Sequence, residues 1–407
     1  MYETIFVARQ PIFTHDMRIW GYELLFRDGK DMRAAVILDG DQATTRVIAD
    51  GFTLASQGMR EGARALINFP RNVLVGSAPY VLPPDRCVVE ILETVAPDGD
   101  VLEACRHLKD AGYLLALDDF VGQPGVEPLC ALADIIKVDI LRKTPAEVRA
   151  IVQGLAPYKA ALLAEKVENQ EMFAVCGKLG FTFFQGYFFS KPEVIPGRKF
   201  SAGELAKIKL LKELSEPDTD IDRLVEVIQT DLSISYRLFQ YINSARFGLR
   251  GKIESVHRAA TMLGRRNLRL WLQVIILSDM STSDKAQELV RISVQRGRFL
   301  QLLAEEGYTP LEPDSMFLLG FFSMLDAILN QRMEQILEDI PLDIRIKSAL
   351  IDRSGVHAAW LSVLRDLDSW DWPAVADKAP KLGVPLDLVG MLNLEAWTWM
   401  IEVMQGT

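Results

Sequence analysis

The strongest constraint on the fold is a series of short apolar runs that alternate with helix-like segments through the first 200 residues. Most runs are apolar through their middles, which is typical of strands buried in a mainly parallel sheet. The eight predicted strands are Thr4–Gln10, Arg18–Arg27, Arg64–Phe69, Cys87–Leu92, Tyr113–Asp118, Asp134–Asp139, Lys159–Glu165 and Phe181–Gly186. Predicted helices between the later strands include Asp98–Ala111, Pro145–Ala156 and Asn169–Leu179. This alternation predicts a (β/α)8 barrel, and the short His15–Met17 connection predicts an antiparallel first pair.

The second half of the chain has a different period. The segment SKPEVIPGRKF at 190–200 carries two prolines and a glycine and is predicted to be a linker, so we expect domains at 1–200 and 201–407. Beyond it the apolar spacing is helical, which predicts an all-α domain. The predicted helices are Ile221–Thr230, Ser233–Ala245, Ser255–Leu263, Arg266–Leu277, Ala286–Glu305, Asp314–Asn330, Met333–Ile340, Asp343–Ile351, Ala358–Asp368 and Leu386–Met404.

Composition narrows the class of protein. The chain has 407 residues with a net charge of -10, which argues against a nucleic-acid surface. Its four cysteines form no CxxC pair, so neither a disulfide framework nor a zinc knuckle is expected. The most apolar stretch, Met316–Leu325, is far shorter than the ~20 residues that span a bilayer. With no signal-peptide pattern at the start, we expect a soluble, cytoplasmic protein that does not enter a membrane.

Polar side chains follow the apolar part of nearly every predicted strand. They are Glu23, Asn68, Glu90, Asp118, Asp119, Lys137, Glu165 and Gln185. The carboxyl ends of barrel strands meet at one mouth, so these groups are expected to form one site. Glu23 lies inside its strand, which suits a strand that runs opposite to the others. Carboxylates in such number suit Mg²⁺ or Mn²⁺, and with a lysine they indicate phosphodiester hydrolysis. The alternative is that each acid only caps the next helix.

The motifs of the first 200 residues resemble those of the EAL domain and occur in the same order. They are ARQPIF at 8–13, GYELLFR at 21–27, INF at 67–69, EILE at 90–93, LDDF at 117–120, IKVD at 136–139, AEKVEN at 164–169 and QGYFFSKP at 185–192. The resemblance implies a barrel that binds cyclic di-GMP and cleaves it to the linear dinucleotide with two Mg²⁺ or Mn²⁺ ions.

The resemblance also implies a role for each matching position. The implied metal ligands are Glu23, Asn68, Glu90, Asp118 and Glu165, with Asp119 at the second metal. Lys137 matches the lysine that holds the attacking water, and Glu168 and Gln185 match further polar residues of the catalytic site. Arg27 would contact the dinucleotide, and Glu93 would support a nearby loop.

Several positions depart from the family pattern. Leu24 replaces the alanine of the name-giving motif, and Lys166 stands where a glycine is usual, next to a ligand, where it can crowd the site or compete for the carboxylates. The loop VGQPGVEPL at 121–129 replaces a sequence that orders the second metal and the barrel dimer. Short spacings between Glu23, Asn68 and Glu90 indicate trimmed outer helices. Hydrolysis and a homodimer therefore both stay open.

Residues from about 205 onward resemble the HDOD domain, a helical relative of the HD hydrolases. The matching segments are Pro217–Gly248 and Ile253–Trp271. HD hydrolases need an adjacent His-Asp pair, whereas this half has only His257 and His357, neither followed by Asp. We therefore expect no catalytic metal site there and instead a module that binds an unknown protein partner.

Three functions remain at this stage. The first is a cyclic di-GMP signalling protein whose barrel binds or hydrolyses the dinucleotide and relays its state to the HDOD module. The second is an active phosphodiesterase with a regulatory HDOD domain. The third is a scaffold that has lost nucleotide binding and acts by protein contacts.

Overall fold

The computed structural model describes residues 5–28, 52–53, 56, 59–60, 62–190, 202–216, 218–244, 247–248, 252–280, 283–309, 311–338, 340 and 342–404. The chain divides into two compact units, one of Met1–Lys191 with Asp366–Pro380 and one of Pro192–Arg365 with Lys381–Thr407. The domain limits expected from the sequence, 1–200 and 201–407, stay a prediction.

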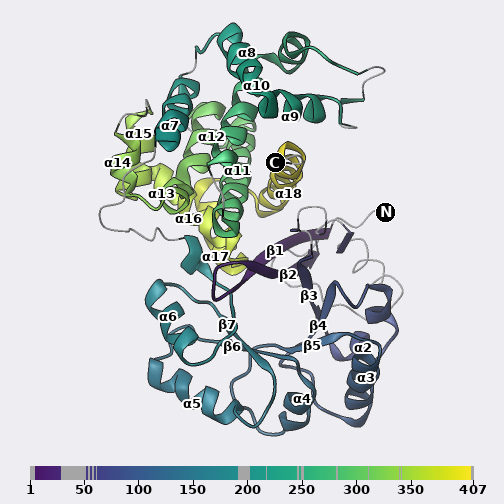
Figure 1. The fold of residues 1–407 in the computed structure, drawn as a ribbon. Coiled ribbons are helices and arrows are strands. Elements are labelled where there is room, and N and C mark those ends of the chain that lie inside the picture. The colour runs from purple at the N-terminus through teal and green to yellow at the C-terminus, as the bar shows by residue number, and fades with distance from the viewer. Residues whose placement is uncertain are drawn as a thin grey trace. The chain divides into compact units, whose positions relative to one another are not determined.

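The first unit is a closed eight-stranded barrel in which each strand pairs with the next one along the chain (Figure 1). The strands are β1 Ile5–Thr14, β2 Ile19–Asp28, β3 Arg64–Phe69, β4 Cys87–Ile91, β5 Leu114–Leu117, β6 Ile135–Asp139, β7 Ala161–Glu165 and β8 Phe183–Phe184. β1 is antiparallel to β2 and to β8, whereas all pairs from β2 to β8 are parallel. The predicted barrel and its antiparallel first pair are confirmed.

The direction expected for the strand of Glu23 is wrong. β2 runs parallel to β3, with Glu23 beside Leu66, and β1 is the reversed strand. Glu23 lies inside its strand because β2 continues to Asp28, past the level at which the other strands end.

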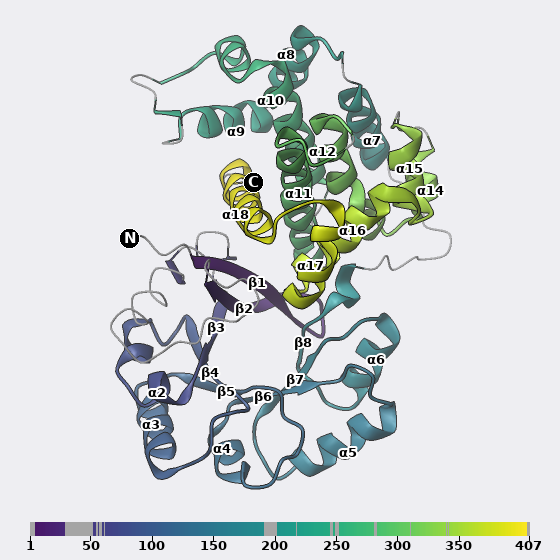
Figure 2. The same ribbon diagram turned by 180° about the vertical axis from the view of Figure 1, so that it is seen from behind.

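Helices lie outside the barrel along the part formed by β3 to β8 (Figure 1, Figure 2). They are α2 Arg71–Leu74, α3 Gly99–Asp110, α4 Glu127–Leu132, α5 Pro145–Leu155 and α6 Gln170–Lys178, with 3-10 turns at Ala78–Val81 and Tyr187–Ser190. Side-chain caps begin the longer helices: Asp98 accepts from the Val101 amide, and Thr144 forms a capping box with Glu147. The four residues of α2 agree with the trimming predicted between Asn68 and Glu90, whereas most of the interval from Glu23 to Asn68 lies outside the described residues.

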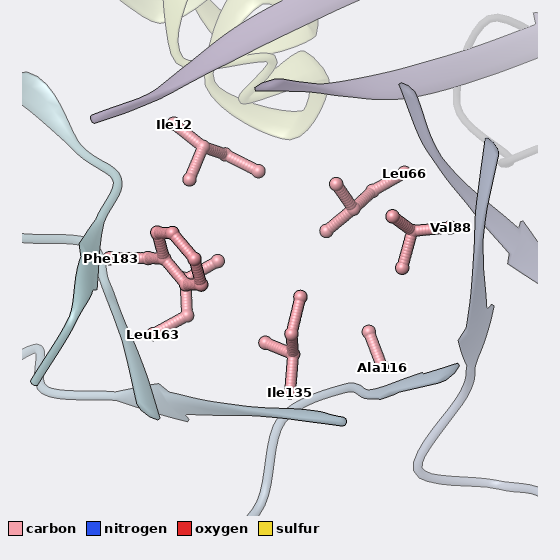
Figure 3. Close-up of a cluster of buried hydrophobic side chains, with 7 residues drawn as sticks. All are labelled: Ile12, Leu66, Val88, Ala116, Ile135, Leu163 and Phe183. Carbon is pink, nitrogen blue, oxygen red and sulfur yellow. The ribbon is translucent and has the colours of Figure 1, made fainter. Parts of the chain in front are cut away.

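The barrel interior is filled by a layer of apolar side chains, one from each of seven strands. They are Ile12, Leu66, Val88, Ala116, Ile135, Leu163 and Phe183, and all are buried (Figure 3). Trp20, Leu114 and Ala161 pack against the layer and are partly buried. The barrel is therefore a filled core, and any polar site must lie above this layer.

The rest of the described chain is helical, as predicted. The helices are α7 Ala202–Ser215, α8 Ile221–Thr230, α9 Leu232–Ile242, α10 Val256–Asp279, α11 Asp284–Glu305, α12 Pro313–Phe321, α13 Leu325–Leu329, α14 Met333–Leu337, α15 Ile344–Ile351, α16 Gly355–Asp368, α17 Trp372–Lys378 and α18 Leu386–Met404, with 3-10 turns at Phe322–Met324 and Pro380–Leu382. Among the described helices, none combines the length and the apolar character that crossing a membrane requires.

Two helix boundaries follow from particular residues. The two helices predicted around 255–277 are both present within α10, where a kink with non-helical geometry at Gly264 (φ 75°, ψ 157°) separates them. The single helix predicted for Asp314–Asn330 is wrong, since it is divided into α12, a 3-10 turn and α13. There the Ser323 hydroxyl donates to the Gly320 carbonyl at 2.6 Å and accepts from Arg296 at 2.8 Å, and such side-chain bonds compete with regular helix.

Glycine allows α11 and α12 to approach closely. A Cβ atom at Gly320 would lie 2.4 Å from the Arg296 carbonyl oxygen, and one at Gly297 would lie 3.1 Å from Phe317. Two helix backbones can meet this closely only where neither has a side chain between them.

We therefore expect Gly320→Ala to lower the free energy of unfolding of the helical unit by about 1–3 kcal/mol, because the added methyl group forces the two backbones apart. Urea unfolding followed by hydrogen exchange of the α11 amides measures this. Gly203→Ala in α7 is the control, since a Cβ there meets nothing within 4 Å and should be neutral or slightly stabilising. Equal stability of the two variants would contradict the close approach.

Candidate active site at the barrel mouth

The predicted site residues form a second layer directly above the apolar one. In six cases, a polar residue in a strand or directly after it stands two positions after the core residue of that strand. Asn68, Glu90, Asp118, Lys137, Glu165 and Gln185 follow Leu66, Val88, Ala116, Ile135, Leu163 and Phe183. Side chains two apart in a strand point to the same face, so residues after an inward-facing core position also face inward. Register adds to this, because Asn68 is directly opposite Glu90 on β3 and β4.

β1 also contributes a polar residue to the same layer, but on this strand the polar residue precedes the core residue in the sequence. Because β1 is reversed, its residue above Ile12 is Gln10, two positions earlier. Gln10 is paired in register with Glu23. Gln185 Nε2 donates to both of them, to Gln10 Oε1 at 2.7 Å and to Glu23 Oε2 at 2.7 Å. Gln10 lies within the ARQPIF motif, and the sequence predicted no role for it; the reversed spacing on β1 is the signal that identifies it.

Lys137 stands at the centre of the layer. Its ammonium contacts Asp118 Oδ1 at 2.8 Å, Glu165 Oε1 at 2.9 Å and Glu23 Oε2 at 3.3 Å, and it also pairs with Glu90. Lys137 is 1% exposed and Glu90 is fully buried. Four carboxylates from four strands thus surround one ammonium group.

This group of side chains carries more negative than positive charge in a buried place. Burial, only partly offset by Lys137, raises the pKa of Glu165 to about 8 and that of Glu90 well above its usual range. Burial alone would lower the pKa of Lys137, but the surrounding carboxylates outweigh it and the pKa is raised. Lys137 is therefore charged, and excess carboxylate charge is what the site has to neutralise, by protonation or by a further cation.

Several buried oxygens of the layer have lone pairs that are available to coordinate a cation. Asn68 Oδ1, Glu90 Oε2, Glu165 Oε2 and Gln185 Oε1 are buried without a hydrogen-bond partner among the residues that the structure describes. Buried oxygens normally have partners. Carboxylate and amide oxygens with free lone pairs fit Mg²⁺ or Mn²⁺.

A second acidic group, which we call the outer carboxylates, lies beside the first. It consists of Glu93, Asp118 and Asp119, whose carboxylate oxygens lie within 4.8 Å of one another. Asp118 belongs to both groups, because its Oδ1 accepts from Lys137 and from the Asp119 amide at 3.0 Å. Glu93, expected to support a loop, thus also lies close to two predicted ligands.

Lys166 approaches the outer carboxylates from β7. Its ammonium binds Asp139 Oδ2 at 2.6 Å and lies 4.0 Å from Asp119 Oδ1. Burial lowers the pKa of Lys166, but the hydrogen bond to Asp139 and the charge of Asp119 outweigh burial and raise it. Asp139 lies within the IKVD motif, but the sequence predicted no role for it. Nothing in the sequence indicated that Lys166 would form an ion pair with this aspartate.

The unusual loop after β5 lines a pocket next to the site. The pocket is small and is bounded by Glu93, Asp118, Phe120, Gln123 and neighbouring apolar side chains. Gln123 Oε1 accepts from the Val121 amide at 3.1 Å, which folds the loop back on itself.

Two predicted site residues are not joined to the layer by these observations. The side chain of Arg27 lies outside the described part of the structure, although its backbone is in β2. Glu168 is exposed in the loop after β7. Their roles stay predictions.

Comparison with known protein families and proteins shows which family this chain belongs to. Residues 67–192 match the EAL domain and residues 206–348 match the HDOD domain. The chain is 36% identical over 403 residues to cyclic di-GMP phosphodiesterase CdgJ of Vibrio cholerae, covering 98% of this chain and 93% of the relative. It is 33% identical over 412 residues to YuxH of Bacillus subtilis, covering 99% of each. The barrel is also similar to an EAL domain protein of Listeria monocytogenes (24% identity, TM-score 0.38, 46% of this chain and 87% of the other).

The two relatives extend over nearly the whole chain, including the segment before residue 67 and the helices after residue 348. The chain therefore belongs to the family of proteins that join an EAL domain to an HDOD domain.

Proposed function

We propose that this protein is a cyclic di-GMP signalling protein whose barrel binds the dinucleotide and, with Mg²⁺ or Mn²⁺, hydrolyses it to the linear form. The observation that carries the proposal is the group of four carboxylates around the buried Lys137. Three of these carboxylates are buried, and the group includes oxygens that have no hydrogen-bond partner in the described part of the chain. The similarity to a relative named a cyclic di-GMP phosphodiesterase supports the choice of substrate.

The proposed metal ligands are the oxygen donors of the layer: Glu23, Asn68, Glu90, Asp118 and Glu165. Asp119, which the resemblance assigned to a second metal, belongs to the outer carboxylates. Their excess negative charge fits divalent cations, since these relieve the cost of burying uncompensated carboxylates. When bound, such ions polarise a phosphodiester and make water a better nucleophile.

The protein's own residues prepare the site. Lys137 has three donor hydrogens, and four carboxylates compete for them. Once cations share the carboxylate charge, a Lys137 hydrogen becomes available to hold water or a phosphate oxygen. Gln185 positions Glu23 through its amide. Arg27 and Glu168 are proposed to contact the dinucleotide and the reacting region respectively.

The helical unit is proposed to pass the state of the barrel to a protein partner in the cytoplasm. Its only two histidines, His257 and His357, are not followed by Asp, so it lacks the paired ligands of an HD hydrolase. Relay by protein contact is therefore the role that fits its residues.

The test uses the purified full chain with cyclic di-GMP and Mn²⁺, following both linear product and free ligand. We expect product with Mn²⁺ or Mg²⁺, none after EDTA treatment, and recovery on adding Mn²⁺ back, because the carboxylates cannot neutralise phosphate charge by themselves. Binding without product would restrict the barrel to sensing. Neither binding nor product would contradict the proposal and favour the scaffold.

A further inference from the structure

Lys166 has an unfavourable backbone conformation at the edge of the site. It directly follows β7 and the predicted ligand Glu165, and its φ is +54°, in the left-handed region. A lysine there costs energy that a glycine would avoid, because its Cβ crowds the neighbouring carbonyl. Strained residues of this kind persist where the surrounding structure holds them, often at functional sites.

The backbone around Lys166 is held firmly by the end of β8. The Val167 amide donates to the Gln185 carbonyl at 3.0 Å, and the Val167 carbonyl accepts from the Phe188 amide at 2.9 Å. A Cβ at Gly186 would lie 2.3 Å from the Val167 nitrogen, so this approach depends on glycine. The base of the Lys166 side chain is thus fixed relative to Gln185.

The Lys166 ammonium is directed at carboxylates. It binds Asp139 Oδ2 at 2.6 Å, and Asp139 Oδ1 accepts from the Leu141 amide at 2.7 Å, which fixes that carboxylate. From this position the ammonium lies 4.0 Å from Asp119, one of the outer carboxylates. A positive charge so close to Asp119 attracts the same carboxylate that a metal ion would need and repels that ion.

The two acidic groups therefore differ in their need for a metal. Three of the four carboxylates around Lys137 are buried, and the four together exceed its single charge, so a further cation would relieve them. The outer carboxylates are more exposed and have Lys166 beside them. Solvent screens the negative charge of these carboxylates and the Lys166 ammonium partly neutralises it, so a second divalent ion stabilises them less.

We propose that the Lys166 ammonium is a built-in cation that replaces a second divalent ion at the outer carboxylates, so that the barrel binds one Mn²⁺ per chain. The inference rests on the proposed function, since it assumes that the carboxylates around Lys137 hold a metal. Lys166 then acts as a positioning residue, because it holds Asp119 and Asp139 without itself reacting.

The test is the number of Mn²⁺ ions bound by the full chain without nucleotide, measured by equilibrium dialysis and by the electron paramagnetic resonance signal of free Mn²⁺. We expect one ion for the wild type and two for Lys166→Gly and Lys166→Met. In the variants, the second ion should bind at least tenfold more tightly than any second ion in the wild type. Lys166→Arg keeps the charge and should stay at one ion, as should the exposed control Lys159→Met.

The outcomes separate the two proposals. Two ions in the wild type, or no gain in either neutral variant, would overturn the role of Lys166 and leave the proposed function standing. No bound Mn²⁺ in any variant would overturn the metal site itself, and this inference with it. Glycine is favoured at this φ and methionine keeps the length of lysine, so agreement between the two variants separates loss of charge from a change in backbone.

Discussion

Lys137→Met is expected to lower the free energy of unfolding of the barrel by about 3–5 kcal/mol in the presence of EDTA, because it leaves buried carboxylates without their cation. The lost ammonium contacts Glu23, Glu90, Asp118 and Glu165, and it is 1% exposed. Hydrogen exchange of the β6 amides during urea unfolding reports on the barrel alone.

Mn²⁺ should restore part of that loss, since an ion that binds only the folded state at about 100 times its dissociation constant adds about 2.7 kcal/mol. Lys159→Met removes an exposed lysine from the loop before β7 and should change the stability by less than about 0.5 kcal/mol. If Lys137→Met were as stable as that control without metal, the ammonium of Lys137 would not stabilise the carboxylates around it, and its proposed place in the site would be wrong.

Glu23→Gln should have opposite effects on function and on stability. It removes one negative charge from the buried group, yet its amide oxygen can still accept from Gln185 Nε2 as Glu23 Oε2 does at 2.7 Å. We expect Mn²⁺ affinity and hydrolysis of cyclic di-GMP to fall at least about 100-fold, because a proposed ligand is lost. Without metal, the barrel should gain about 1 kcal/mol, because less unpaired charge is buried.

The matched control is Glu103→Gln on the exposed face of α3, which should change neither turnover nor stability appreciably. Product formation is followed by chromatography, and stability by hydrogen exchange as above. Wild-type turnover in Glu23→Gln would rule out Glu23 as a ligand, and with it the site as proposed.

Much of the barrel could be predicted because the side chains of its strands follow a simple two-residue period. Apolar runs located the strands, and the polar residue at the end of each run located the site. In the structure these polar residues stand two positions beyond a core residue, as with Leu66 and Asn68 or Ile135 and Lys137. Both signals are local to a strand and need no knowledge of its neighbours. This is why the groups around Lys137 were expected together and are found together.

The features that escaped prediction depend on contacts between distant segments. The direction of β2 and the place of Gln10 depend on which strand is reversed. Both follow from the fact that β1 is that strand. The pairing of Lys166 with Asp139 depends on a left-handed backbone conformation at Lys166, which cannot be predicted from the presence of a lysine. In the helical unit, the break at Ser323 depends on a hydrogen bond from Arg296 on another helix.

The reversed β1 also determines when the barrel can close during synthesis. β1 is made first, and its antiparallel partner β2 follows at once, so the two can form a hairpin early. Its other partner, β8, is made last of all the strands and meets it only at Phe13 with Phe184 and Thr14 with Phe183. The ring therefore has a seam, joined by only two residue pairs and separated by the longest intervening chain. Until β8 leaves the ribosome, the hairpin has one unpaired edge, and closing this seam is a late, non-local step of folding.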